Sequence, residues 1–99
     1  MYVYIYDDFT NQSKYNKILY KIETRLTDLG LNGKIVRLGV SKNLKTAVDN
    51  ELRQGAKTFV AVGNDKTVSE LATVLANNQS DEKQRVSLGI IPIDRKSVV

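Results

Sequence analysis

The chain has 99 residues, the length of a single domain. Apolar residues make up 41% of it and charged residues 26%, a balance that excludes intrinsic disorder. Cysteine and histidine are both absent, which excludes disulfides, thiolate metal sites, a cysteine nucleophile and the commonest general base. The net charge of +4 suits anionic partners, but the basic residues are scattered and not interleaved with aromatic ones. We therefore expect no binding to nucleic acid.

The chain carries no sign of membrane insertion or export. Its apolar runs all fall short of the roughly 20 residues that span a bilayer. The first residues lack a basic region and continue directly into Asp7-Asp8, which is typical of a strand and not of a signal peptide. The sequence thus predicts no transmembrane segment and a cytoplasmic location.

The hydrophobic period alternates between about 2 and about 3.6 residues, as in alternating strands and helices. In the first half of the chain, this pattern predicts a strand at Tyr2–Tyr6, a helix at Gln12–Leu29 and a strand at Lys34–Leu38. Gly30 supplies a left-handed stop after the first helix. Ser41 is the expected N-cap of a second helix, which ends at Gly55. Its apolar stripe consists of Leu44, Ala47, Val48 and Leu52.

The second half continues the alternation. A nearly all-apolar strand is expected at Thr58–Val62, a helix at Thr67–Ala76, a polar loop over residues 77–84 and a last strand at Val86–Ile91. The order β-α-β-α-β-α-β implies right-handed crossovers. It predicts one α/β domain over residues 1–99, a Rossmann-like three-layer α/β/α fold with a small, mainly parallel four-stranded sheet. Because such a sheet is small, a homodimer or a separate completing domain is also considered.

In open parallel sheets ligands bind beyond the carboxyl ends of the strands. The segments expected there are 7–10, 38–41, 63–67 and 92–96. In the segment 63–67, Gly63 allows a tight turn and Asn64 tolerates a left-handed conformation. Thr67 then opens a helix whose free N–H groups favour an anion, and Lys66 adds a positive charge. This predicts a phosphate-binding turn formed by Gly63, Asn64, Asp65, Lys66 and Thr67.

Each of these features has a second interpretation. Thr67 and Glu70 also fit a capping box, with Thr67 as the N-cap, which needs no ligand. Asp7-Asp8 could hold Mg²⁺ weakly or form a solvated turn, and we favour the turn. Tyr2, Tyr4 and Tyr6 alternate along one face of their strand and could stack on bases, but core or subunit packing is preferred. We predict no metal site.

The stretch from Val60 to Glu70, Val-Ala-Val-Gly-Asn-Asp-Lys-Thr-Val-Ser-Glu, resembles the Gly-Gly-Asp-Gly-Thr nucleotide-binding motif of the diacylglycerol kinase catalytic domain family. NAD kinases and sphingosine kinases share related forms. The resemblance covers about residues 1–93, corresponding to the N-terminal half of a family member. It implies an NAD kinase-like N-terminal fold, ATP with Mg²⁺ as the ligand, and phosphate contacts at the matching positions Gly63, Asp65, Thr67 and Glu70.

The chain departs from this pattern. Asn64 and Lys66 replace two glycines, and Ile93-Asp94-Arg95-Lys96-Ser97 stands where the family usually has Gly-Thr-x-Asn. The leading hypothesis is therefore a degenerate kinase-like nucleotide-binding domain, non-catalytic or regulatory on its own, whose partner is a nucleotide or another phosphorylated small molecule. Two alternatives stay open: an interaction or oligomerisation module that keeps the fold without nucleotide, and part of an active lipid kinase completed by another domain or chain.

Overall fold

The computed structural model describes residues 2–39, 42–78 and 86–93. Strands and helices alternate along this part of the chain, as the hydrophobic period predicts. Their bounds are β1 (Tyr2–Tyr6), α1 (Asn16–Asp28), β2 (Lys34–Arg37), α2 (Leu44–Arg53), β3 (Thr58–Gly63), α3 (Asp65–Asn78) and β4 (Ser87–Pro92). None of the helices in these ranges is both long and apolar enough to cross a membrane.

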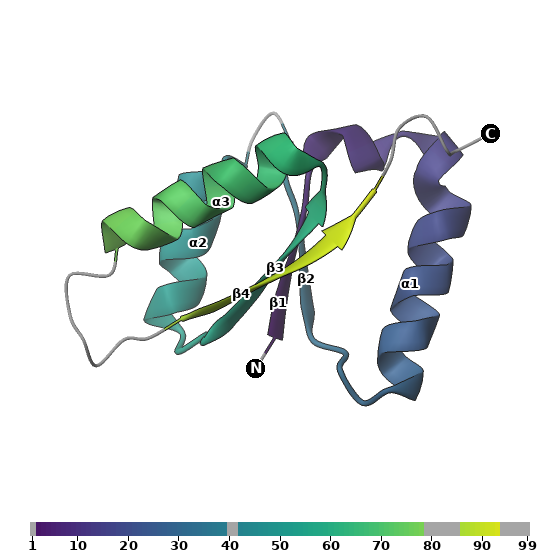
Figure 1. Ribbon diagram of the computed structural model, residues 1–99, viewed down its shortest axis with the longest axis horizontal. Helices are drawn as coiled ribbons and strands as arrows, with labels where there is room; N and C mark the ends of the chain where they lie inside the picture. The colour runs from purple at the N-terminus through teal and green to yellow at the C-terminus, as the bar shows by residue number, and fades with distance from the viewer. Residues whose placement is uncertain (1, 40–41, 79–85, 94–99) are drawn as a thin grey trace.

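The four strands form one parallel sheet in the order β2-β1-β3-β4. Ile5 of β1 pairs with Val36 on one side and with Ala61 on the other, and Ala61 pairs in turn with Ile90 of β4. Helices α2 and α3 lie together on one side of the sheet and α1 lies on the other (Figure 1). The predicted Rossmann-like α/β architecture is confirmed.

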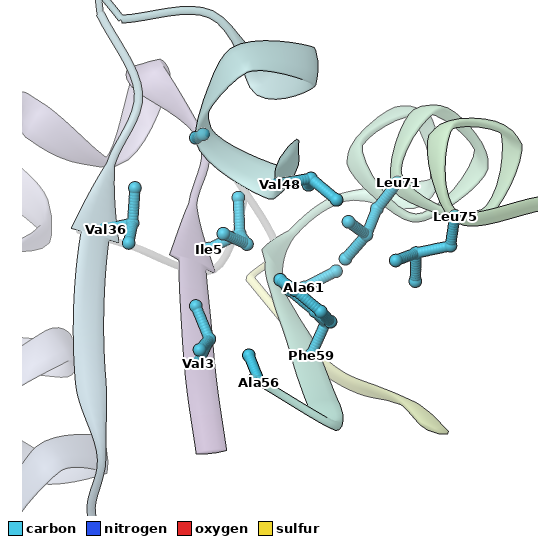
Figure 2. Close-up of a cluster of buried hydrophobic side chains, with 10 residues drawn as sticks. Val3, Ile5, Val36, Val48, Ala56, Phe59, Ala61, Leu71 and Leu75 are labelled. Carbon is cyan, nitrogen blue, oxygen red and sulfur yellow. The ribbon is translucent and has the colours of Figure 1, made fainter. Parts of the chain in front are cut away.

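One layer of the core lies between the sheet and helices α2 and α3. Alternate residues of β1 and β3 point into it, including Ile5 and Phe59, while Val48 of α2 and Leu71 of α3 point back toward the sheet (Figure 2). All four side chains are completely buried. Burial of each such side chain contributes about 1.5–3 kcal/mol, so this layer fixes where α3 begins relative to the end of β3.

The other layer lies under α1 and is built around tyrosines. Tyr4 and Tyr6 of β1 are buried there together with Leu19 of α1 and Tyr15, while Tyr2 is 36% exposed at the start of the strand. Because β1 is a central strand, its tyrosines are covered by the helix on their face of the sheet. The preference for core packing over a base-stacking platform is confirmed for Tyr4 and Tyr6.

The first helix begins later than predicted. Two short 3-10 turns, Asp8–Asn11 and Ser13–Tyr15, precede α1, and Gln12 between them is extended. A continuous helix from Gln12 is therefore wrong, because the chain must first pass from the end of β1 to the face that α1 covers. The stop at Gly30 is confirmed by its φ of 72°.

The second helix is capped by a different residue from the one predicted. Asn43 precedes α2, and its side-chain oxygen accepts a hydrogen bond of 2.8 Å from the N–H of Thr46. Ser41 lies outside the described residues. Asparagine and serine are equally good N-caps, so the residue type does not decide between them. The N-cap is Asn43 because the helix begins at the next residue, Leu44. Gly55 ends the helix with a φ of 88°, as expected.

The remaining boundaries differ by one or two residues. β2 stops at Arg37, β3 continues to Gly63, β4 runs from Ser87 to Pro92, and α3 extends to Asn78. The rest of the predicted polar loop, residues 79–84, lies outside the described part of the chain. These shifts leave the order and number of the predicted strands unchanged.

Candidate functional site

The candidate turn lies where β1 and β3 end side by side at the carboxyl edge of the sheet. Thr67 is 1% exposed, and its hydroxyl donates a hydrogen bond to the carboxylate of Asp7, the residue that follows β1. Asp7 is itself tied to β3, since its N–H donates to the carbonyl of Val62 over 3.1 Å. The structure thus joins two segments that are far apart in the sequence.

Gly63 is required by the packing of these two residues. A Cβ at this position would clash with the hydroxyl oxygen of Thr67 and would lie 3.1 Å from the Cβ of Asp7. Gly63 is buried and its φ is not positive. Internal packing therefore accounts for the glycine without any need for a ligand to approach it.

Asn64 caps helix α3. Its side-chain oxygen accepts a hydrogen bond from the N–H of Thr67, and its own N–H donates to the Thr67 hydroxyl, both over 3.2 Å. Its carbonyl accepts the first helical bond, from Val68. This is a reciprocal capping box, but it begins at Asn64. The prediction that Thr67 is the N-cap, with Glu70 reaching back, is wrong, and α3 begins at Asp65 instead of Thr67.

Asp7 is held in its charged form by its hydrogen bonds. Burial alone would raise the pKa of its carboxyl group, but hydrogen bonds from Thr67, Asp8 and the backbone of Phe9 together bring the pKa below its ordinary value of 3.8. The half-buried Asp7 is thus a structural partner of Thr67, whereas Asp8 is exposed in the first turn of the 3-10 helix, as the interpretation of a solvated turn expects. Among the described residues, no three acidic side chains gather closely enough to hold a metal ion.

The other predicted site residues lie at the surface. Asp65, Lys66 and Glu70 are exposed, and the Lys66 ammonium lies 3.9 Å from the Glu70 carboxylate. The first N–H groups of a helix have no partner within it. Since the N–H of Thr67 is bonded to Asn64, those of Asp65 and Lys66 are the ones left to face solvent or a ligand.

The neighbouring segments of the same edge are only partly described. Ile93 donates its N–H to the carbonyl of Gly63 over 2.7 Å, which fixes the end of β4 beside the turn. On the opposite side, Asn11 donates to the carbonyl of Leu38 over 2.9 Å. The rest of the predicted edge segments, residues 40–41 and 94–96, lies outside the described ranges.

The charges decide what this turn can bind. It offers two free N–H groups and the Lys66 ammonium, but the carboxylates of Asp7, Asp8 and Asp65 stand on or beside it. A bare phosphate would be repelled by these carboxylates. A phosphate that arrives with a divalent cation is better matched, because the cation offsets both sets of negative charge.

The turn lies between β3 and α3, as the sequence predicts, but the bond from Thr67 to Asp7 was not predicted. The contact between Asp7 and Thr67 depends on β1 lying next to β3, and the strand order was not assigned from the sequence. The sequence did indicate that the two segments are close, because Asp7 and Gly63 each follow directly after a predicted apolar strand. In a doubly wound sheet such positions meet at one edge.

Two comparisons with known proteins find sequences similar to this chain. The model of the diacylglycerol kinase catalytic domain matches residues 1–93. One curated relative, a "Probable lipid kinase YegS-like" protein of Xanthomonas campestris pv. campestris (strain 8004), is 41% identical over 46 residues. That alignment covers 46% of this chain and 15% of the relative, so the similarity spans a small part of the longer protein.

Proposed function

Because this chain belongs to the diacylglycerol kinase catalytic domain family, we propose that it is a degenerate nucleotide-binding domain that binds Mg²⁺-ATP weakly at the turn formed by residues 63–67 and at Glu70. The observation that carries the proposal is the packing of Gly63 and Thr67 against Asp7, which presents the start of α3 at the carboxyl edge of the sheet. The predicted cytoplasmic location is part of the same proposal.

The turn fits a nucleotide phosphate in part. The N–H groups of Asp65 and Lys66, with the Lys66 ammonium, would contact phosphate oxygens, and Mg²⁺ would supply the positive charge that the nearby carboxylates require. Asn64 works against tight binding, since its side chain occupies the Thr67 N–H that a phosphate could otherwise use. We therefore expect a dissociation constant in the millimolar range.

The same geometry supports the absence of catalysis by this chain alone. Phosphoryl transfer depends on positioning and on charge neutralisation around metal and phosphate. In the described part of the chain, the turn brings one lysine and two free N–H groups to the phosphate, and no cluster of acidic residues that could hold a metal adjoins them. These observations favour a regulatory or purely binding role in the proposal.

Titration of ¹⁵N-labelled protein with Mg²⁺-ATP and Mg²⁺-ADP tests the proposal. We expect the amides of residues 63–69 to shift at millimolar nucleotide, and Lys66→Gln to weaken binding. Asn64→Gly should strengthen binding, because it frees the N–H of Thr67 while costing only a few tenths of a kcal/mol of stability. Lys21→Gln, at an exposed position of α1 on the opposite side of the sheet, is the matched control. Unchanged amides at the turn would refute nucleotide binding.

A second candidate function is that of a module completed by another domain or by a second copy. The observation that favours it is β4, which pairs only with β3 among the described strands. Leu88 and Ile90 of β4 are 37% and 54% exposed on the side of the sheet that bears α3. Sedimentation of wild type and of Ile90→Lys tests association with a second copy. If β4 forms the interface, wild type should dimerise and Ile90→Lys should not. A wild type that is monomeric at all concentrations would argue against a second copy.

A further inference from the structure

A cavity lies between α1 and the strands β1 and β2, and none of its lining residues belongs to the turn. Its volume is about 210 Å³. It is lined by Tyr4, Tyr6, Glu23, Leu26, Thr27, Asn32, Gly33 and Ile35, and we call it the α1 cavity. An engineered apolar cavity of about 150 Å³ in another protein holds benzene, so this space is large enough for a small organic molecule.

Two polar groups in the wall of the α1 cavity have unused bonding capacity. The Tyr6 hydroxyl is buried and has no hydrogen-bond partner among the described residues. The Glu23 carboxylate forms no ion pair with any residue in those ranges. By contrast, the Tyr4 hydroxyl donates to the carbonyl of Leu31, and the Thr27 hydroxyl donates to that of Glu23. A buried hydroxyl without a partner costs about 1–3 kcal/mol, which a bound ligand would recover.

The two groups lie close enough to affect each other. Burial and, after it, the negative charge of Glu23 raise the pKa of the Tyr6 hydroxyl to about 12, so the hydroxyl is neutral at pH 7. Among the residues that the structure describes, no lysine or arginine lines the cavity. The guanidinium of Arg37 stacks 5.0 Å from the centre of the Tyr6 ring, but Arg37 is not a lining residue of the cavity. The cavity therefore combines aromatic and aliphatic walls with one carboxylate that has no counter-ion within it.

We propose that the α1 cavity binds a small organic molecule bearing a primary ammonium group. The ammonium would donate hydrogen bonds to the Glu23 carboxylate and to the Tyr6 hydroxyl oxygen. The hydrocarbon part would lie against Leu26, Ile35 and the ring of Tyr4. A carboxylate-bearing ligand is disfavoured because Glu23 would repel it.

Benzylamine, charged at pH 7, and benzyl alcohol, its neutral analogue, are the probes for an NMR titration of the full chain. We expect benzylamine to shift the amides of Tyr4, Tyr6 and Ile35, and to bind about tenfold more tightly than the alcohol, the equivalent of one charge-assisted hydrogen bond. Glu23→Gln should weaken benzylamine about tenfold while leaving the alcohol unchanged. Tyr6→Phe should also weaken benzylamine.

Asp28→Asn and Tyr20→Phe make the same chemical changes at exposed positions of α1 and should leave both probes unaffected. Far-UV circular dichroism of each variant establishes that it is folded. Equal binding of amine and alcohol, no effect of Glu23→Gln in a folded protein, or no shifts with either probe would overturn the proposal. None of these residues belongs to the turn at 63–70, so the outcome is independent of Mg²⁺-ATP binding.

Discussion

Replacing Thr67 by valine removes the hydroxyl that joins β1 to α3 and keeps the shape of the side chain. The lost contact is a charge-assisted hydrogen bond to Asp7, and such bonds contribute about 1.5–3 kcal/mol. Because Asp7 is half-buried, we expect a loss of about 2 kcal/mol, toward the lower end of that range. The N–H of Asn64 also loses its acceptor, but Asn64 is half-buried, so water can replace it.

Urea unfolding followed by circular dichroism at pH 7 measures this loss directly. A loss of about 2 kcal/mol corresponds to a fall of about 8–16 °C in the melting temperature of a domain of this size. Thr73→Val is the matched control, since the Thr73 hydroxyl is exposed and only bonds to the carbonyl of Ser69 in the same helix. We expect that control to remain within about 0.5 kcal/mol of wild type.

The pH dependence gives an independent check of the same contact. The pKa of Asp7 is lowered in the folded protein, so the stability it contributes is complete above its unfolded pKa and is lost as the pH falls through the lower folded value. The difference between wild type and Thr67→Val should therefore shrink by about half below the folded pKa, where the bond becomes neutral. A difference that stays constant into acid, or a variant as stable as wild type at pH 7, would refute the assignment.

Three further predictions concern stability and are measured by urea unfolding. Gly63→Ala should lower the free energy of unfolding by about 1–3 kcal/mol, because the added Cβ would clash with the Thr67 side chain. Unchanged stability would contradict that contact. Leu71→Ala should lower the free energy of unfolding by about 2–5 kcal/mol because it leaves a cavity in the core, whereas Leu29→Ala, at a half-exposed site, should have little effect. Similar losses for the two variants would argue against the core described above. Lys34→Met should cost about 2–3 kcal/mol by leaving the buried Glu51 carboxylate unpaired, and adding Glu51→Leu should restore most of it. No recovery in the double variant would contradict this explanation.

The sequence predicted most of the fold because each element carries its own local pattern. The continuous apolar and aromatic runs of β1 and β3, and the glycines at 30 and 55, can be recognised from neighbouring residues alone. The caps were harder to predict. Two overlapping patterns, Asn64 with Thr67 and Thr67 with Glu70, both satisfy the rules for a helix start.

The choice between those two patterns is made by Asp7. It draws the Thr67 hydroxyl toward the sheet, and Asn64 is then left to cap the helix. Such a choice depends on a contact between distant segments, which only the strand order reveals. The location of the turn could thus be predicted from local sequence, but the roles of its side chains could not.

The central place of β1 has a consequence for how the chain acquires its structure. Ile5, near the N-terminus, pairs with residues of both β2 and β3, and those two strands do not pair with each other. The four described strands contain no hairpin that could form early from adjacent residues, so each of their pairings requires closure of a long loop. We therefore expect folding on the millisecond-to-second scale, with β1 amides among the slowest to exchange with deuterium. During synthesis, β1 gains its second neighbour only after β3 has left the ribosome.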